Sequence, residues 1–242
     1  MKISEYLHIL DSEGKLLARA AEAAGTGADV ATCPDWQVRD LLRHTGVVHR
    51  WAAAFVAEGH TSPRAPGEEP ELDGAALVDW YRQAHAGLVA TLRDASPDVQ
   101  CWAFLPAPSP LAFWARRQAN ETTIHRVDAE SALGGEPSPI GAEFAADGVD
   151  ELLTGFHARD RSRVRTEKPR TLRVRTTDTG DVWTVRLTQE PPVTERGEAG
   201  EAECEISGPA EQLYLSLWNR APFPQVTGDS ALSTLWRESS GV

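Results

Sequence analysis

The chain has 242 residues, of which 41% are hydrophobic and 25% charged, a balance typical of a globular protein with one large domain or two small ones. Its formal net charge of −12 repels nucleic acid and anionic membrane surfaces, so neither is expected as a partner. Cys33, Cys101 and Cys204 are far apart and odd in number, which argues against a disulfide framework or a cysteine-bound zinc. We therefore expect any metal to be held by histidine and carboxylate side chains.

The N-terminal segment lacks the positive start, the continuous apolar run and the cleavage site of a signal peptide. No uncharged apolar stretch approaches the roughly 20 residues that span a bilayer. The sequence therefore predicts a cytoplasmic protein.

The first part of the chain is predicted to be helical, with Pro- and Gly-rich loops between the helices. The first helical pattern ends at Gly25. The second follows Asp35, an N-cap candidate, and runs to about Gly59. We predict helices over 3–24, 36–59, 74–94, 111–133 and 141–157.

From about residue 160, apolar and polar residues alternate and β-branched residues become frequent. DTGD joins two such runs and is typical of a hairpin turn. An amphipathic pattern follows Gly208 and Pro209. We predict strands over 170–177, 182–188 and 203–207 and a helix over 210–220.

The change from a period near 3.6 to a period of 2 indicates a domain boundary near residues 158–168. We predict a helical bundle over 1–158 and a small α+β domain over 159–242. The expected fold class is therefore α+β, mostly α.

His44 lies on the apolar face of the second predicted helix. Leu41, Val48, Trp51 and Phe55 recur at spacings of seven, three and four residues, which places them on one face with His44 in its middle. The imidazole must point into the bundle, where its nitrogens need partners. On its own, this pattern is more typical of a core histidine bound to a carbonyl or hydroxyl than of a metal ligand.

Glu121 and His125 are four residues apart and share a face of the fourth predicted helix. Asp128 lies on the same face at the next turn, where it could orient His125 or make a surface contact. A Glu-x-x-x-His pair is common on helix surfaces, but an inward His44 in the same bundle supplies a third ligand. Two histidines and one carboxylate leave positions open for water or substrate. We therefore predict a divalent-metal site of His44, Glu121 and His125, with zinc as the default and nickel, iron or manganese as alternatives. His49 is about 140° around the helix from His44 and is not expected to be a ligand.

CPDWQVRDLLRHTGVVHRW and FWARRQANETTIHRVDAE resemble DinB-like metal-binding four-helix bundles, and more narrowly the mycothiol-dependent maleylpyruvate isomerase family of actinobacteria. By this resemblance one helix supplies the first ligand and a later Glu-x-x-x-His helix the other two, which matches His44, Glu121 and His125. TTDTGDVWTV and ISGPAEQLYLSLWNRAP resemble the small C-terminal α+β domain of that family, which is related to sterol-carrier folds.

The resemblance implies mycothiol as a thiol cosubstrate. A divalent metal would stabilise its thiolate, which could add to a small electrophilic substrate and either isomerise it or form a stable conjugate. Arg220, in LWNRAP, matches an arginine that meets substrate carboxylates in the family, and an exposed helix-terminal arginine is the alternative. Arg82 could face the site from mid-helix, although a solvated surface arginine is more common at such a position. A monomer is expected.

Two other functions fit the same residues. An enzyme of this fold could use metal-activated water as a hydrolase, in which case turnover would not need a thiol. A non-catalytic protein could instead bind a small hydrophobic or acidic ligand, with or without metal. Trp51 and Trp114 are predicted to be core residues, with a place in the pocket lining as the alternative, whereas His85 and His157 have no partner visible in the sequence.

Overall fold

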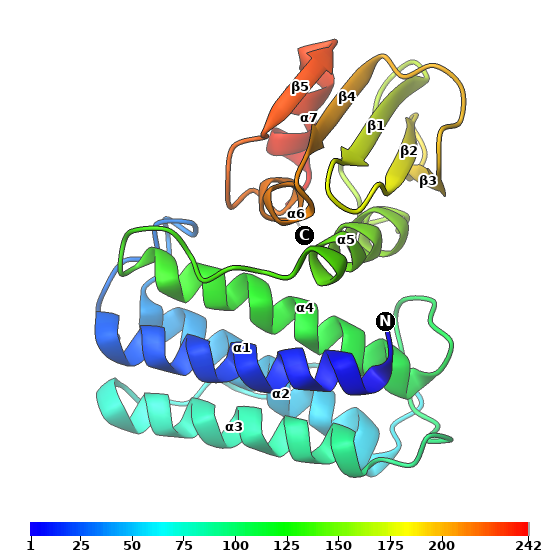
Figure 1. The fold of residues 1–242 in the computed structure, drawn as a ribbon. Coiled ribbons are helices and arrows are strands. Elements are labelled where there is room, and N and C mark those ends of the chain that lie inside the picture. The colour runs from blue at the N-terminus through cyan, green and yellow to red at the C-terminus, as the bar shows by residue number, and fades with distance from the viewer. Residues whose placement is uncertain (242) are drawn as a thin grey trace. The chain divides into compact units, whose positions relative to one another are not determined.

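The computed structural model describes residues 1–241, and their contacts divide the chain into two compact units that meet in sequence between Ser138 and Pro139. The first unit is helical, and the second combines helices with a sheet (Figure 1). The predicted α+β class, mostly α with an N-terminal helical bundle, is confirmed. No helix within the described residues combines the length and the apolarity needed to cross a bilayer.

Four long helices form the first unit: α1 (Ile3–Ala24), α2 (Val38–Glu58), α3 (Gly74–Asp94) and α4 (Pro110–Ser131). α1 packs mainly against α4 and α3, and α2 against α3 and α4, so the order around the bundle is α1–α4–α2–α3. Their apolar stripes recur at helical spacing and bury a shared core. This core includes Leu17, Leu41, Leu42, Leu77 and Tyr81.

The helix ends depend on local hydrogen bonds. Asp73 caps α3 through its side chain, which accepts from the backbone N of Gly74 at 2.8 Å. The prediction that Asp35 caps α2 is wrong, because α2 begins two residues later, with Gln37 as the N-cap. There the Asp40 carboxylate accepts from the Gln37 backbone N at 2.9 Å, which satisfies one of the free donors of the first turn.

The second unit begins with α5 (Ala142–Asp150), which continues as a π-helical turn, η1 (Glu151–Phe156). Its sheet has the order β3-β2-β1-β4-β5, in which β1 and β4 are parallel and the other neighbours antiparallel. The predicted hairpin joins β1 and β2, and Gly180 turns it with a φ of +75°. The strands are β1 (Arg170–Thr176), β2 (Val182–Leu187), β3 (Val193–Arg196), β4 (Cys204–Gly208) and β5 (Gln225–Gly228), and the later helices are α6 (Ala210–Leu217) and α7 (Ser230–Ser239).

Two features of the second unit differ from the sequence-based description. α5 packs against α6, so the division between the units falls earlier than the boundary predicted near residue 158. β3, β5 and α7 were not predicted. β3 and β5 are four residues long, lie at the sheet edges and leave most of their residues exposed, so neither carries an alternating apolar pattern.

Candidate metal centre

α4 positions the candidate site, and it carries many polar side chains that are nevertheless buried. Such groups cost free energy unless they find partners. The partners of Arg126 are two carboxylates. Its Nε lies 2.7 Å from an oxygen of Glu13, and its Nη1 lies 2.7 Å from an oxygen of Glu130. Arg117 and His125 instead contact Glu121, and Asp128 contacts His125.

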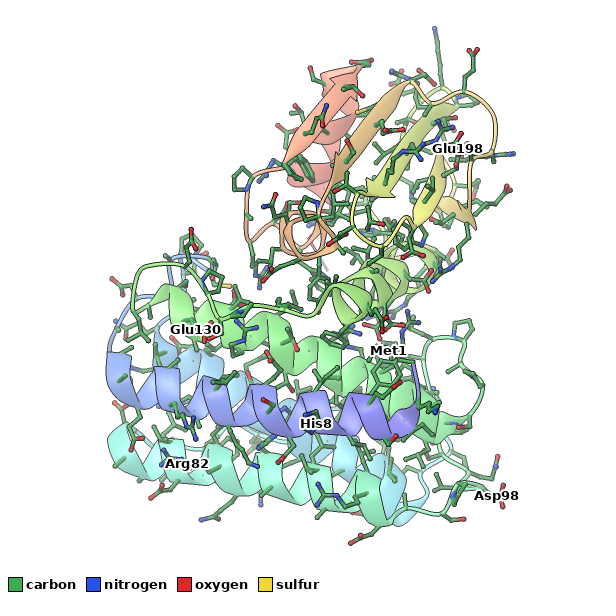
Figure 2. The ribbon with its side chains drawn as sticks, in the orientation of Figure 1. Met1, His8, Arg82, Asp98, Glu130 and Glu198 are labelled. Atoms are coloured by element: carbon green, nitrogen blue, oxygen red, sulfur yellow. The ribbon has the colours of Figure 1, made fainter. Side chains whose placement is uncertain are left out.

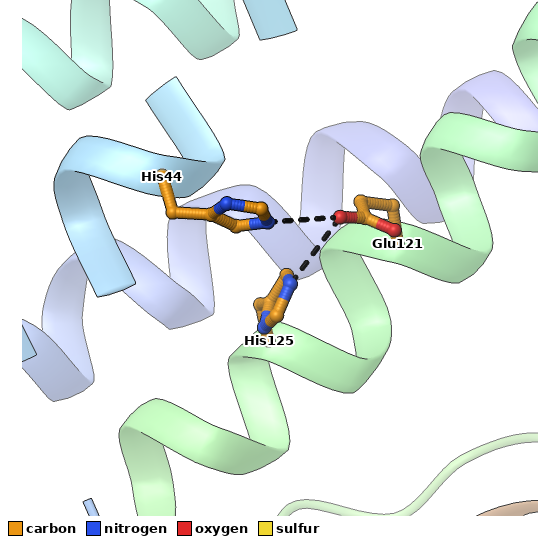
Figure 3. A group of neighbouring side chains, drawn as sticks. All are labelled: His44, Glu121 and His125. Carbon is orange, nitrogen blue, oxygen red and sulfur yellow. Dashed lines mark hydrogen bonds and ion pairs between the residues drawn. The ribbon is translucent and has the colours of Figure 1, made fainter. Parts of the chain in front are cut away.

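His44 from α2 meets Glu121 and His125 from α4, as Figure 3 shows. Glu121 Oε1 lies 3.4 Å from His44 Nε2 and 3.3 Å from His125 Nε2. One ligand atom from each residue lies within 4.8 Å of the other two. The three predicted ligands therefore meet at one point, because Glu121 and His125 share a face of α4 and His44 lies on the inward face of α2.

His125 is oriented by a chain of hydrogen bonds. Its Nδ1 lies 2.9 Å from Asp128 Oδ2, and the Thr32 hydroxyl donates to Asp128 Oδ1 at 2.6 Å. An ionised carboxylate only accepts, so Nδ1 carries the proton and Nε2 faces the cluster. Asp128 thus holds the imidazole in the tautomer that a metal would need.

Arg117 holds the other oxygen of Glu121. Its buried guanidinium donates from Nη2 to Glu121 Oε2 at 3.1 Å, while Glu121 Oε1 faces the two histidines. Burial would raise the pKa of Glu121, but hydrogen bonds from His125 and His44 and the nearby positive charges of His125 and Arg117 hold it well below its usual value. Glu121 is therefore an anion with one oxygen engaged and one turned toward the candidate ligands.

In the metal-free protein His125 holds a second proton. Burial would lower the pKa of this imidazole, but the hydrogen bonds to Asp128 and Glu121 and the charges of these carboxylates raise it to about 9. A cation binding at Nε2 must displace that proton.

The loop that precedes α2 covers one side of the cluster. Trp36 lies 5.1 Å from the His44 ring and 6.2 Å from the His125 ring between centroids, and it stacks nearly parallel to the latter. A backbone hydrogen bond from Val30 N to Trp36 O at 2.9 Å closes the loop that carries both Trp36 and Thr32. The His44 side chain keeps 37% of its surface exposed, so the cluster remains open to solvent beside this residue.

The arrangement fits a small divalent cation. Two ligand atoms about 2.1 Å from a tetrahedral ion lie about 3.4 Å apart, close to the separations of Glu121 Oε1 from the two imidazole nitrogens. Two neutral imidazoles and one carboxylate suit zinc, nickel, iron or manganese, and three protein ligands leave at least one position for an exogenous group.

The two arginines predicted to be catalytic belong to different units of the chain. Arg82, labelled in Figure 2, makes ion pairs with Glu22 at 2.7 Å and Asp79 at 3.1 Å and does not join the cluster, which fits the surface alternative. Arg220 belongs to the second unit, where it is half-buried and donates from Nη1 to the Trp218 carbonyl at 2.8 Å. Its role toward a substrate stays a prediction.

Three buried histidines outside the cluster have structural partners. His49 Nε2 lies 2.9 Å from the Thr122 hydroxyl, and burial, together with the nearby His85, holds the His49 pKa well below its usual value. His85 Nε2 lies 2.9 Å from the Leu10 carbonyl, and His157 Nδ1 lies 3.1 Å from the Ser162 hydroxyl. His49 is thus separate from the candidate ligands, as its position around the helix predicts.

Three residues of the site were not identified from the sequence as its supports: Arg117, Thr32 and Trp36. Arg117 had a signal, because it lies one turn before Glu121 on the same stripe. Thr32 and Trp36 lie in a loop, where no periodicity shows which side chains turn toward a helix that is distant in sequence.

Residues 7–130 match the family described as the mycothiol maleylpyruvate isomerase N-terminal domain, and residues 143–234 match the MDMPI C-terminal domain. Among solved structures, a mycothiol-dependent maleylpyruvate isomerase aligns with a TM-score of 0.64 and 16% identity over 94% of this chain and 92% of that chain. A variant of that isomerase with one histidine changed to alanine aligns with a TM-score of 0.65 and 14% identity over 94% and 93% of the two chains. A comparison with curated proteins finds no match.

Proposed function

Because the chain belongs to the mycothiol-dependent maleylpyruvate isomerase family, we propose that it is a divalent-metal enzyme that uses a low-molecular-weight thiol, mycothiol, on a small electrophilic substrate. The observation that carries this proposal is the convergence of the ligand atoms of His44, Glu121 and His125. The isomerase and the S-transferase reactions share the same first step, addition of a thiolate to an electrophilic carbon.

His44, Glu121 and His125 would hold the cation, with zinc as the expected metal. When bound, the cation would lower the pKa of a thiol and stabilise its anion near neutral pH. The chain's own cysteines are not needed for this step, because Cys33, Cys101 and Cys204 lie outside the cluster.

The surrounding residues prepare the site for that chemistry. Asp128 keeps the His125 proton on Nδ1, and Arg117 occupies Glu121 Oε2, so Nε2 and Oε1 are the atoms presented to the cation. Trp36 covers two imidazole rings and limits the access of water on that side. We further propose that the Arg220 guanidinium binds a substrate carboxylate, for which its planar fork of donors is suited.

Elemental analysis of the purified protein tests the metal site. Wild type should contain close to one equivalent of metal after incubation with zinc, and His44→Ala and His125→Ala should lose it while remaining folded by circular dichroism. His8→Ala is the matched control, because His8 is an exposed histidine of α1 outside the cluster (Figure 2). Wild type that binds neither zinc nor nickel would overturn the proposal.

Thiol dependence then separates the proposed reaction from the two alternatives. Turnover of an electrophilic substrate that requires mycothiol and is lost in His44→Ala supports the thiol-dependent enzyme. Turnover without thiol would identify a hydrolase using activated water. Metal binding without turnover in either assay would favour a binding protein.

A further inference from the structure

A second concave site lies in the helical unit, on the flank of α2. It has a volume of about 310 Å³ and is bounded by α2, by the 60–68 segment that follows this helix, and by Trp80 of α3. Cavities that bind small molecules start at about 300 Å³, so this one can enclose a single small ring system.

Aromatic side chains form the inner wall of this cavity. Phe55 is buried, and Trp51 meets it edge-on with ring centroids 5.1 Å apart. Trp51 also donates from Nε1 to the Arg64 carbonyl at 2.8 Å, which ties the covering segment to α2. Trp80 lines the cavity from α3. Flat apolar faces held by packing and a hydrogen bond favour a planar apolar ligand.

Two arginines give the lining a positive charge. Arg50 lies over the Trp80 ring, with its guanidinium carbon 5.6 Å from the ring centroid, and Arg64 lines the cavity from the covering segment. Neither guanidinium has a carboxylate within ion-pair distance in the part of the chain that the structure describes, although the chain has 36 acidic and 24 basic residues. Glu68 is the acidic residue of the lining, and His60 is already paired with Glu58 at 2.8 Å.

This cavity is distinct from the candidate metal centre. None of His44, Glu121 and His125 lines it. Arg50 is six residues beyond His44, about 240° around α2, so the two side chains leave the helix on different sides.

We propose that this cavity binds a small aromatic carboxylate, with the ring between Trp51, Phe55 and Trp80 and the carboxylate at Arg50 and Arg64. A guanidinium can donate two parallel hydrogen bonds to a carboxylate, and an arginine already stacked on an indole loses little conformational freedom on binding. This proposal does not depend on the metal centre.

Isothermal titration calorimetry with 1-naphthoate and its uncharged analogue 1-naphthylmethanol tests the site on chelator-treated protein, so that no metal can hold the carboxylate. We expect wild type to bind 1-naphthoate more tightly than the alcohol. The double variant Arg50→Gln/Arg64→Gln should bind 1-naphthoate about tenfold more weakly, because charge-assisted hydrogen bonds are lost. Trp80→Leu should weaken the binding of both compounds. Arg93→Gln is the matched control, since Arg93 is an exposed α3 arginine outside the lining.

Three results would overturn the proposal. The first is equal affinity of wild type for the acid and the alcohol, or no binding of either. The second is a double variant that binds 1-naphthoate as wild type does, when circular dichroism shows both proteins folded. The third is loss of 1-naphthoate binding in His44→Ala, which would place the ligand at the metal centre instead. A protein that fails to bind metal but binds 1-naphthoate as described would refute only the proposed function.

Discussion

Gly46 allows α2 and α3 to approach closely, so we expect Gly46→Ala to destabilise the protein. A Cβ at this position would lie 2.1 Å from Cζ3 and 2.7 Å from Cη2 of the Trp80 ring, far inside van der Waals contact. Such overpacking costs about 1–3 kcal/mol. Alanine also favours the helix over glycine by about 1 kcal/mol, so the net loss of unfolding free energy should be about 1 kcal/mol.

Gly87→Ala in α3 is the matched control, because a Cβ at Gly87 would meet nothing within 4 Å. This variant gains the helix propensity without the clash and should be about 1 kcal/mol more stable than wild type. The difference between the two variants therefore isolates the steric cost, about 2 kcal/mol. Urea unfolding followed by far-UV circular dichroism measures both. A Gly46→Ala protein as stable as Gly87→Ala would refute the close approach of Trp80 to α2.

Metal binding should strengthen with pH. A cation displaces the proton from His125, whose pKa is about 9. The apparent zinc affinity, measured by chelator competition, should therefore rise about tenfold per pH unit up to about pH 9. An affinity that does not change with pH would contradict this reasoning. Arg117→Met should lower zinc affinity about 10- to 100-fold, because Glu121 loses the partner that orients it. An unchanged zinc affinity in this folded variant would contradict the role of Arg117 in positioning Glu121. Burial lowers the pKa of His157 from 6.5 to about 4, so the unfolded chain binds a proton before the folded one does. The free energy of unfolding should therefore be highest above pH 6.5 and should fall by up to about 3 kcal/mol as the pH drops toward 4. His157→Phe should flatten this slope in urea titrations at pH 7 and 5, and an equal slope in both proteins would show that another group causes it.

Periodicity in the sequence determined most of the helical unit. The helices predicted over 3–24 and 74–94 coincide with α1 and α3, because an amphipathic stripe and its flanking glycine and aspartate are local features. The same reasoning placed Glu121 and His125 on one face and His44 on an inward one, so their meeting could be anticipated before any contact was known. Their role as metal ligands stays a prediction.

Only the tertiary structure decided what surrounds those residues. The Thr32 hydroxyl reaches Asp128 across 96 positions of the chain, and no local pattern encodes such a contact. The sequence places Arg117 on the helix stripe of Glu121, but the burial of its side chain beside Glu121 depends on how α4 packs. The edge strands β3 and β5 form because the neighbouring strands β2 and β4 offer unpaired backbone groups. The sequence by itself determines the face on which a side chain lies, because helix and strand geometry repeat locally, whereas its partner depends on packing between segments distant in the chain.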